Sequence, residues 1–114
     1  MKEDLVIEIV KKTNFIVNLE DDDGDTIFHW AAYNDTMESL LEYLLSREDT
    51  VIDKQNMDGY TPLHCAVYSN NLNAVRMLLE NDCDINIINN ARETALDVAK
   101  QNKRKEIKSL LKKA

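Results

Sequence analysis

The sequence contains few of the residues that build flexible linkers. Its 114 residues include only two glycines and one proline. So little glycine and proline leaves no room for an interdomain linker, and we therefore expect a single domain over residues 1–114. The two glycines are also too few and too far apart to form a phosphate-binding loop.

Long apolar runs and a secretion signal are absent as well. Apolar runs extend for only a few residues, whereas a membrane-spanning helix needs about 20. Acidic residues follow Lys2, where a secretory signal peptide would carry basic ones. Cys65 and Cys83 are the only cysteines; without such a signal we expect two reduced thiols, with a disulfide as the alternative. These observations predict a cytoplasmic or nuclear protein.

Positive charge is scarce outside one end of the chain. The formal net charge is −7, but residues 100–114 hold seven basic residues and one acidic residue, which leaves −13 on residues 1–99. The basic segment could bind phosphates or anionic lipids, or it could form the polar end of a C-terminal helix. No aromatic residue interleaves with its lysines, so we predict no nucleic-acid partner and no membrane partner.

What the sequence does contain is a short motif that occurs three times. Thr61-Pro62-Leu63-His64-Cys65-Ala66 has one counterpart that begins at Thr26, 35 residues earlier, and another that begins at Thr94, 33 residues later. Each threonine can cap the N-terminus of a helix, and Pro62 suits the first helical position. A period of about 33 residues indicates stacked repeats, since a helix pair this short cannot bury its apolar face alone.

The spacing of apolar residues places two helices after each turn and one before the first. We expect helices at residues 3–12, 26–34, 37–46, 61–69, 72–81, 94–101 and 103–113. In the first of them, Leu5, Val6, Ile9 and Val10 should form the inner face. The first repeat is two residues longer than the others, and we place one extra residue between its helices and one near residues 47–50.

The Thr-Pro-Leu-His-x-Ala motif at this period resembles the ankyrin repeat, and the resemblance covers residues 3–113. It implies an all-α solenoid of about three and a half helix-turn-helix repeats with β-hairpin-like finger loops. A half-repeat at residues 1–21 would precede repeats at about 22–56, 57–89 and 90–114. The third repeat departs from the pattern, because Arg92 replaces a glycine and Asp97 replaces a histidine.

The resemblance and the turn chemistry together give six residues a structural role: Gly24, Thr26, His29, Gly59, Thr61 and His64. In the family, the histidine ties neighbouring turns together by hydrogen bonds. No cysteine, histidine or acid joins either histidine at ligand spacing, so we predict no metal, no cofactor and no catalytic residue. Trp30 stands at the same repeat position as Cys65 and Val98, which argues for at least partial burial. We therefore expect Trp30 to belong to the core, with a role as a contact residue as the alternative.

The resemblance also implies a concave binding face, formed by the finger tips and the first helix of each repeat. Repeat register places these predicted partner-binding residues on it: Asp22, Asp23, Asp25, Tyr33, Asn34, Met57, Asp58, Tyr60, Tyr68, Ser69, Asn90, Glu93 and Gln101. Tyrosines and a methionine suit binding hot spots, and the acids would steer a partner with a basic or mixed basic and apolar surface. The alternative for the acids is that they are merely solvated.

We therefore predict a monomeric protein-interaction module that is not an enzyme. One alternative is a stoichiometric inhibitor or assembly chaperone of a larger enzyme. A metal-dependent enzyme is a remote alternative, because the chain shows no acid–base constellation. An enzyme should present a deep pocket with clustered ionisable groups, whereas a module should present a shallow groove.

Overall fold

The computed structural model describes residues 2–12 and 17–114. The predicted half-repeat at residues 1–21 therefore includes residues 13–16, which lie outside the described part of the chain. In these two ranges the structure has no strand and seven α-helices: α1 (Lys2–Lys12), α2 (Ile27–Tyr33), α3 (Glu38–Ser46), α4 (Pro62–Tyr68), α5 (Leu72–Glu80), α6 (Ala95–Gln101) and α7 (Lys105–Lys113). Each helix begins and ends within two residues of its predicted bounds.

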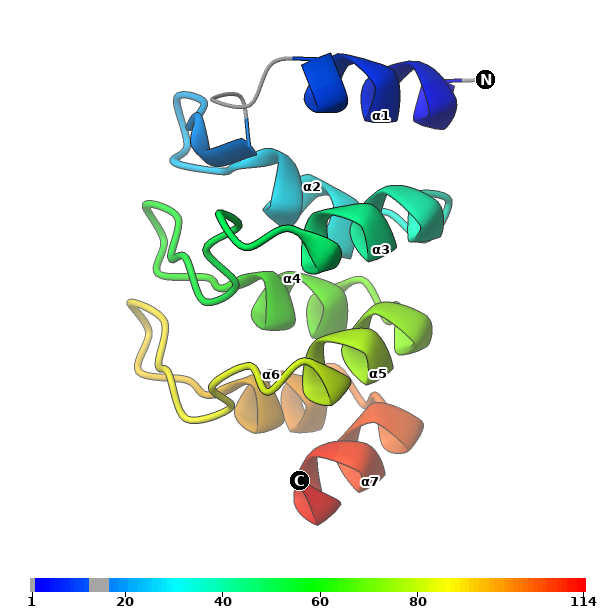
Figure 1. Ribbon diagram of the computed structural model, residues 1–114. Helices are drawn as coiled ribbons and strands as arrows, with labels where there is room; N and C mark the ends of the chain where they lie inside the picture. The colour runs from blue at the N-terminus through cyan, green and yellow to red at the C-terminus, as the bar shows by residue number, and fades with distance from the viewer. Residues whose placement is uncertain (1, 13–16) are drawn as a thin grey trace.

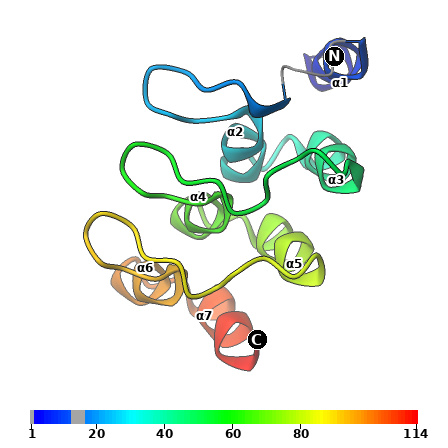
Figure 2. The same cartoon turned by 60° about the vertical axis from the view of Figure 1, so that its left-hand side comes forward.

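The helices form two stacked rows. An inner row contains α2, α4 and α6, an outer row contains α3, α5 and α7, and α1 lies beyond α3 at the end of the outer row (Figure 1). Three loops precede the inner helices and project to the same side: finger 1 (residues 19–25), finger 2 (54–60) and finger 3 (87–93) (Figure 2). The fold is thus the all-α repeat solenoid that the sequence predicts.

Each inner helix begins with the same hydrogen-bonded cap. The capping residues are Thr26, Thr61 and Thr94, and each threonine side chain accepts a hydrogen bond from the backbone N–H three residues later. The side chain at that third position, a histidine twice and an aspartate once, accepts in return from the threonine N–H. Such reciprocal caps satisfy two backbone donors that a helix start otherwise leaves unpaired. They fix the point at which each finger becomes a helix.

The apolar core runs without interruption between the two rows. The outer helices contribute inner stripes such as Leu40 and Leu44 in α3, Leu78 in α5, and Ile107 and Leu111 in α7, all of them buried. Burial of one leucine side chain stabilises a fold by about 2 kcal/mol. Because each stripe packs on the neighbouring repeats, the core exists only in the stack.

The predicted inner face of α1 is half wrong. Val10 is fully buried and Val6 packs against the core, but Leu5 and Ile9 are exposed, by 62% and 44%. Instead, Ile7 packs against the core. The reason is that α1 packs mainly against one helix, α3, and a helix with one neighbour buries only a narrow stripe.

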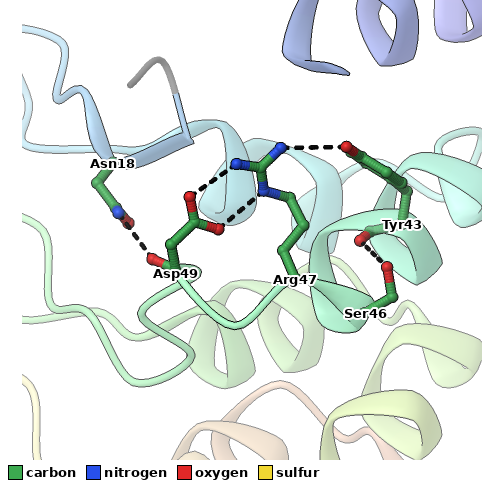
Figure 3. Close-up of polar contacts among 5 residues, drawn as sticks. All are labelled: Asn18, Tyr43, Ser46, Arg47 and Asp49. Carbon is green, nitrogen blue, oxygen red and sulfur yellow. Dashed lines mark hydrogen bonds and ion pairs between the residues drawn. The ribbon is translucent and has the colours of Figure 1, made fainter. Parts of the chain in front are cut away.

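The longer first repeat places its extra residues in loops. Residues 34–37 separate α2 from α3, whereas only residues 69–71 separate α4 from α5. After α3, the guanidinium of Arg47 donates two hydrogen bonds to the Asp49 carboxylate, at 2.8 and 2.7 Å, and a third to the Tyr43 hydroxyl at 3.1 Å (Figure 3). Asn18 donates to the Asp49 carbonyl at 2.8 Å (Figure 3). This cluster fastens the longer loop to the segment that leads into finger 1.

Candidate functional site: a groove between the first two fingers

The three fingers share one turn, which is built around a side-chain oxygen. Asp21, Asn56 and Asn89 stand at equivalent positions, and the side-chain Oδ1 of each accepts hydrogen bonds from the N–H groups two and four residues later, at 2.9–3.0 Å. Aspartate and asparagine form such local turns readily. In the sequence, only their spacing of 35 and 33 residues, which matches the repeat, marks these three residues.

The fingers lie close enough to bond backbone to backbone. The Met57 N–H donates to the Asp23 carbonyl at 2.9 Å, and the Asn90 N–H donates to the Asp58 carbonyl at 3.0 Å. Gly24 and Gly59 have positive φ angles of 76° and 82°, and a Cβ atom on them would lie 2.9 and 2.7 Å from the nitrogens of Met57 and Asn90. Glycine is therefore required at both positions for backbone conformation and for space.

The two buried histidines join consecutive repeats. The Nδ1 of His29 accepts a hydrogen bond from the Thr26 N–H at 3.1 Å, and its Nε2 lies 3.0 Å from the Tyr60 carbonyl oxygen. Because a carbonyl only accepts and a backbone N–H only donates, the ring is the neutral form protonated on Nε2. His64 makes the same two contacts, with its own capping threonine and, at 2.9 Å, with the Glu93 carbonyl. Burial lowers the pKa of His64, although the Glu93 carbonyl favours the charged ring. Both ring nitrogens are used, so neither histidine offers a free metal ligand.

A hollow of about 650 Å³ opens between finger 1 and α2 on one side and finger 2 and α4 on the other. We call it the aromatic pocket. Its lining residues are Leu19, Glu20, Asp21, Asp25, Thr26, Ile27, His29, Trp30, Tyr33, Asn56, Tyr60, Cys65 and Tyr68. Four of the partner-binding residues expected from the sequence, Asp25, Tyr33, Tyr60 and Tyr68, thus come together in one place.

The expectation that Trp30 belongs to the core is wrong. Its side chain is 43% exposed and lines the aromatic pocket, whereas its repeat equivalents Cys65 and Val98 are 8% and 2% exposed. The indole of Trp30 is much larger than the side chains of Cys65 and Val98, so it needs more neighbouring surface to be covered. Moreover, α2 is the first inner helix in the row, so no earlier inner helix within the described residues covers it (Figure 1).

The walls of the aromatic pocket are apolar and its rim is acidic. Burial raises the pKa of the Cys65 thiol to about 12 and raises the pKa of the Tyr60 phenol, so both groups stay neutral. Tyr33 and Tyr68 are 51% and 46% exposed, so their rings can be reached from solvent. Rim carboxylates come from finger 1, where one oxygen of Asp25 accepts from the Asn56 amide at 2.8 Å. The hollow therefore combines neutral, largely apolar walls with carboxylates from finger 1.

The other predicted partner-binding residues lie around this pocket. Asn34 and Ser69 line an adjacent hollow of about 550 Å³, together with Tyr33, Tyr68 and Arg104. Five more of the predicted residues are exposed near the finger tips: Asp22, Asp23, Met57, Asp58 and Asn90.

Two further predicted residues, Glu93 and Gln101, belong to finger 3 and the end of α6, away from the aromatic pocket. The Glu93 carboxylate accepts a hydrogen bond from Asn89 at 2.9 Å, and its pKa is lowered by hydrogen bonds from Asn89 and Gln101. These side chains are thus engaged with each other and with finger 3. Neither residue lines the aromatic pocket, although the Glu93 carboxylate lies close enough to Tyr60 to help raise the pKa of that phenol.

Three carboxylates of finger 1 also come together. Asp21, Asp23 and Asp25 have oxygens within 4.8 Å of one another, a spacing that could suit a cation. The turn accounts for this proximity, because Asp21 already accepts from the backbone N–H groups of the other two. Exposed acids so arranged are common without a metal.

Several residues of the aromatic pocket were not predicted from the sequence to line a binding site. Besides Trp30, these are Leu19, Glu20, Asp21, Ile27, Asn56 and Cys65. Leu19 is 53% exposed in finger 1, and a leucine just before a run of acids was the available signal.

Cys65 and Cys83 are both buried free thiols, and burial raises the Cys83 pKa to about 12 as well. Across the described ranges, no helix has the length and apolar character needed to span a bilayer.

Comparison with known families agrees with the repeat architecture. A family model described as ankyrin repeats (three copies) matches residues 2–89 and again residues 53–114. No curated protein matches the chain.

Proposed function

Because the chain belongs to the ankyrin-repeat family, whose members generally mediate protein–protein interaction, we propose that it binds a partner protein through the groove that holds the aromatic pocket. The observation that carries the proposal is the gathering of Trp30, Tyr33, Tyr60 and Tyr68 in one solvent-accessible hollow. Tryptophan and tyrosine are enriched at binding hot spots, since they offer large rigid area with a polar end. The groove thus has the composition of a binding surface.

The acidic residues of the fingers would speed the first encounter with a partner. Five of the six residues in the segment 20–25 are acidic, and the finger tips carry Asp58 as well. Such a field attracts a partner with a basic or mixed basic and apolar surface and raises the association rate. A further hollow lies on the outer row between α3 and α5, where Arg76 is mixed with Glu38, Glu42 and Glu80, and it has no comparable aromatic lining.

A catalytic role has less support. The histidine rings use both nitrogens in hydrogen bonds, and the Cys65 thiol stays protonated because burial raises its pKa to about 12. Neither group is therefore poised as a base, a metal ligand or a nucleophile. We propose a binding module without chemistry of its own.

The decisive experiment measures binding after changes on opposite parts of the molecule. A partner identified by affinity capture and mass spectrometry is titrated with the purified protein and with Tyr68→Ala. This change should weaken binding by about 2 kcal/mol or more, close to a 30-fold rise in Kd. It should disturb folding little, because the Tyr68 side chain is 46% exposed and its backbone carbonyl still accepts from Arg104 at 2.7 Å.

The control is Lys108→Ala on α7, which should leave the Kd nearly unchanged. A loss of binding in Lys108→Ala with none in Tyr68→Ala would place the binding surface on the basic helix instead. A salt series tests the acids separately. The association rate should fall markedly between about 0.05 and 0.5 M salt. If the rate does not depend on salt, the acidic residues of the fingers contribute only to solubility.

A further inference from the structure

We propose that the aromatic pocket receives one cationic side chain, the guanidinium or ammonium of an arginine or lysine, from an exposed segment of the partner protein. This inference rests on the proposed function and names the chemistry of the group that the groove recognises. It draws on three independent properties of the pocket: its aromatic walls, its charge and its apolar side.

The aromatic walls come from both sides of the pocket. Trp30 and Tyr33 belong to α2, Tyr68 belongs to α4, and Tyr60 ends finger 2. The negative faces of aromatic rings attract cations, tryptophan most strongly and tyrosine next. Three of the four rings are 43–51% exposed, so they lack the cover that would exclude a ligand.

The rim is negative. Glu20, Asp21 and Asp25 line the hollow, and the segment 20–25 contains no basic residue. Lys54 forms an ion pair with Glu20 at 2.9 Å, but it is not part of the lining. A cationic side chain in the pocket would therefore meet carboxylates at its charged end, whereas an acidic side chain would be repelled.

Leu19 and Ile27 give the pocket an aliphatic side, and the neutral Cys65 thiol adds to it. Arginine and lysine carry a charged end on an aliphatic stem and bury that stem on apolar surface. A hollow of about 650 Å³ can hold such a side chain together with part of the backbone that carries it. An apolar side chain would contact the aromatic and aliphatic walls but would leave the carboxylates at the rim without a partner.

The test uses the only tryptophan of the chain as its reporter. Trp30 lines the pocket, so its fluorescence reports occupancy directly. The full chain is titrated with capped pentapeptides of sequence Gly-Gly-X-Gly-Gly, where X is arginine, citrulline, lysine or norleucine. Citrulline keeps the shape of arginine without the charge, and norleucine keeps the stem of lysine. The arginine and lysine peptides should produce a saturable change, and the neutral peptides should bind about tenfold or more weakly. Equal affinity for arginine and citrulline, or no saturable response to arginine and lysine, would overturn the inference.

One substitution separates charge from structure. Asp21→Asn removes a rim charge but should preserve the turn, since Asn56 and Asn89 make the same hydrogen bonds in fingers 2 and 3. We expect it to weaken the arginine peptide about threefold or more, with an unchanged melting temperature. The matched control is Asp82→Asn, which makes the same change in charge at an exposed position after α5 where asparagine also tolerates a φ of 59°. Equal affinities for the two variants would show that the rim charge does not act on the ligand.

The two proposals can fail separately. If Tyr68→Ala lowers the affinity for the natural partner but the citrulline peptide binds as well as the arginine peptide, the groove is the binding surface but does not recognise a cation. If the arginine peptide binds as expected while Tyr68→Ala leaves the natural partner unaffected, the proposed function falls, and with it the assignment of the cation to a partner protein.

Discussion

Within residues 17–114, the three fingers form two junctions that share a histidine bond and a backbone bond but differ in their surfaces. The first junction joins finger 1 and α2 to finger 2 and α4, and the second joins finger 2 and α4 to finger 3 and α6. Each has one histidine bonded to the carbonyl of the next repeat, from His29 at 3.0 Å and from His64 at 2.9 Å. Each also has one backbone bond between finger tips, at 2.9 and 3.0 Å.

The residues that face the groove differ between the junctions. Trp30, Tyr60 and Tyr68 at the first junction correspond in repeat register to Cys65, Glu93 and Gln101 at the second. At the first junction, Trp30, Tyr33, Tyr60 and Tyr68 line one hollow, the aromatic pocket. The comparison separates two kinds of position: those that repeat hold the stack together, and those that vary give one junction its own surface.

The largest effect should come from placing a side chain between two fingers. Gly59→Ala adds a Cβ 2.7 Å from the Asn90 nitrogen at a φ of 82°, so both the backbone and its neighbour must move. We expect a loss of about 3 kcal/mol in the free energy of unfolding, since the clash adds to a conformational cost of about 1–2 kcal/mol. Urea unfolding measures it. A loss below about 1 kcal/mol would mean that the fingers are not packed on each other as described.

Removal of the joining histidine should cost somewhat less. His64→Ala leaves the Thr61 N–H and the Glu93 carbonyl without their partner, and we expect a loss of about 1–3 kcal/mol. His29→Ala should give a similar loss, because it breaks the same pair of bonds at the first junction. Thermal unfolding with and without a metal chelator is the check on the role of the rings. A drop of several degrees caused by the chelator would show that the histidines bind a metal.

These repeating positions were largely predictable from the sequence. The cap threonines and the turn glycines follow from local chemistry and from the period, and the role of the histidines follows from the family resemblance. The structure places helix starts at Ile27, Pro62 and Ala95, as the threonine caps require. Local rules suffice there because each of these residues bonds to a partner at a fixed offset in the sequence. Repetition then reveals the offset three times.

The groove was less predictable. Averaging over repeats suggested a buried Trp30, because its equivalents Cys65 and Val98 are small and buried. The exposure of Trp30 depends on the size of its side chain and on the place of α2 at the end of the inner row, which are properties of the assembled stack. Likewise, the contact of Leu19 with the aromatic pocket depends on how finger 1 lies beside α2. Repeat averages do not contain this information.

A pH series sharpens the comparison further. Burial lowers the pKa of His64 in the folded state below its ordinary value of 6.5, so between these two values the unfolded chain binds more protons than the folded one. The stabilisation from the neutral ring is therefore complete above pH 6.5 and is lost as the pH falls through the folded-state pKa. Unfolding in urea from pH 7 downward should show this decline, and His64→Ala should show a shallower one. An equal slope in both proteins would remove His64 as the titrating group.

The smallest effect concerns the one finger that lacks a glycine. Arg92 occupies the position of Gly24 and Gly59 with a φ of 65°, and within residues 17–114 no fourth finger packs on it. The steric demand of the next finger is thus absent, and only the conformational cost of about 1–2 kcal/mol remains, offset in part because glycine gains more freedom on unfolding. We therefore expect Arg92→Gly to raise the free energy of unfolding by about 0.5 kcal/mol. Arg92→Ala is the control, because alanine keeps the strained φ and should leave stability nearly unchanged. If Arg92→Gly were destabilising while Arg92→Ala were neutral, the positive φ at position 92 would carry no measurable conformational cost. The need for glycine in fingers 1 and 2 would then lie in packing alone.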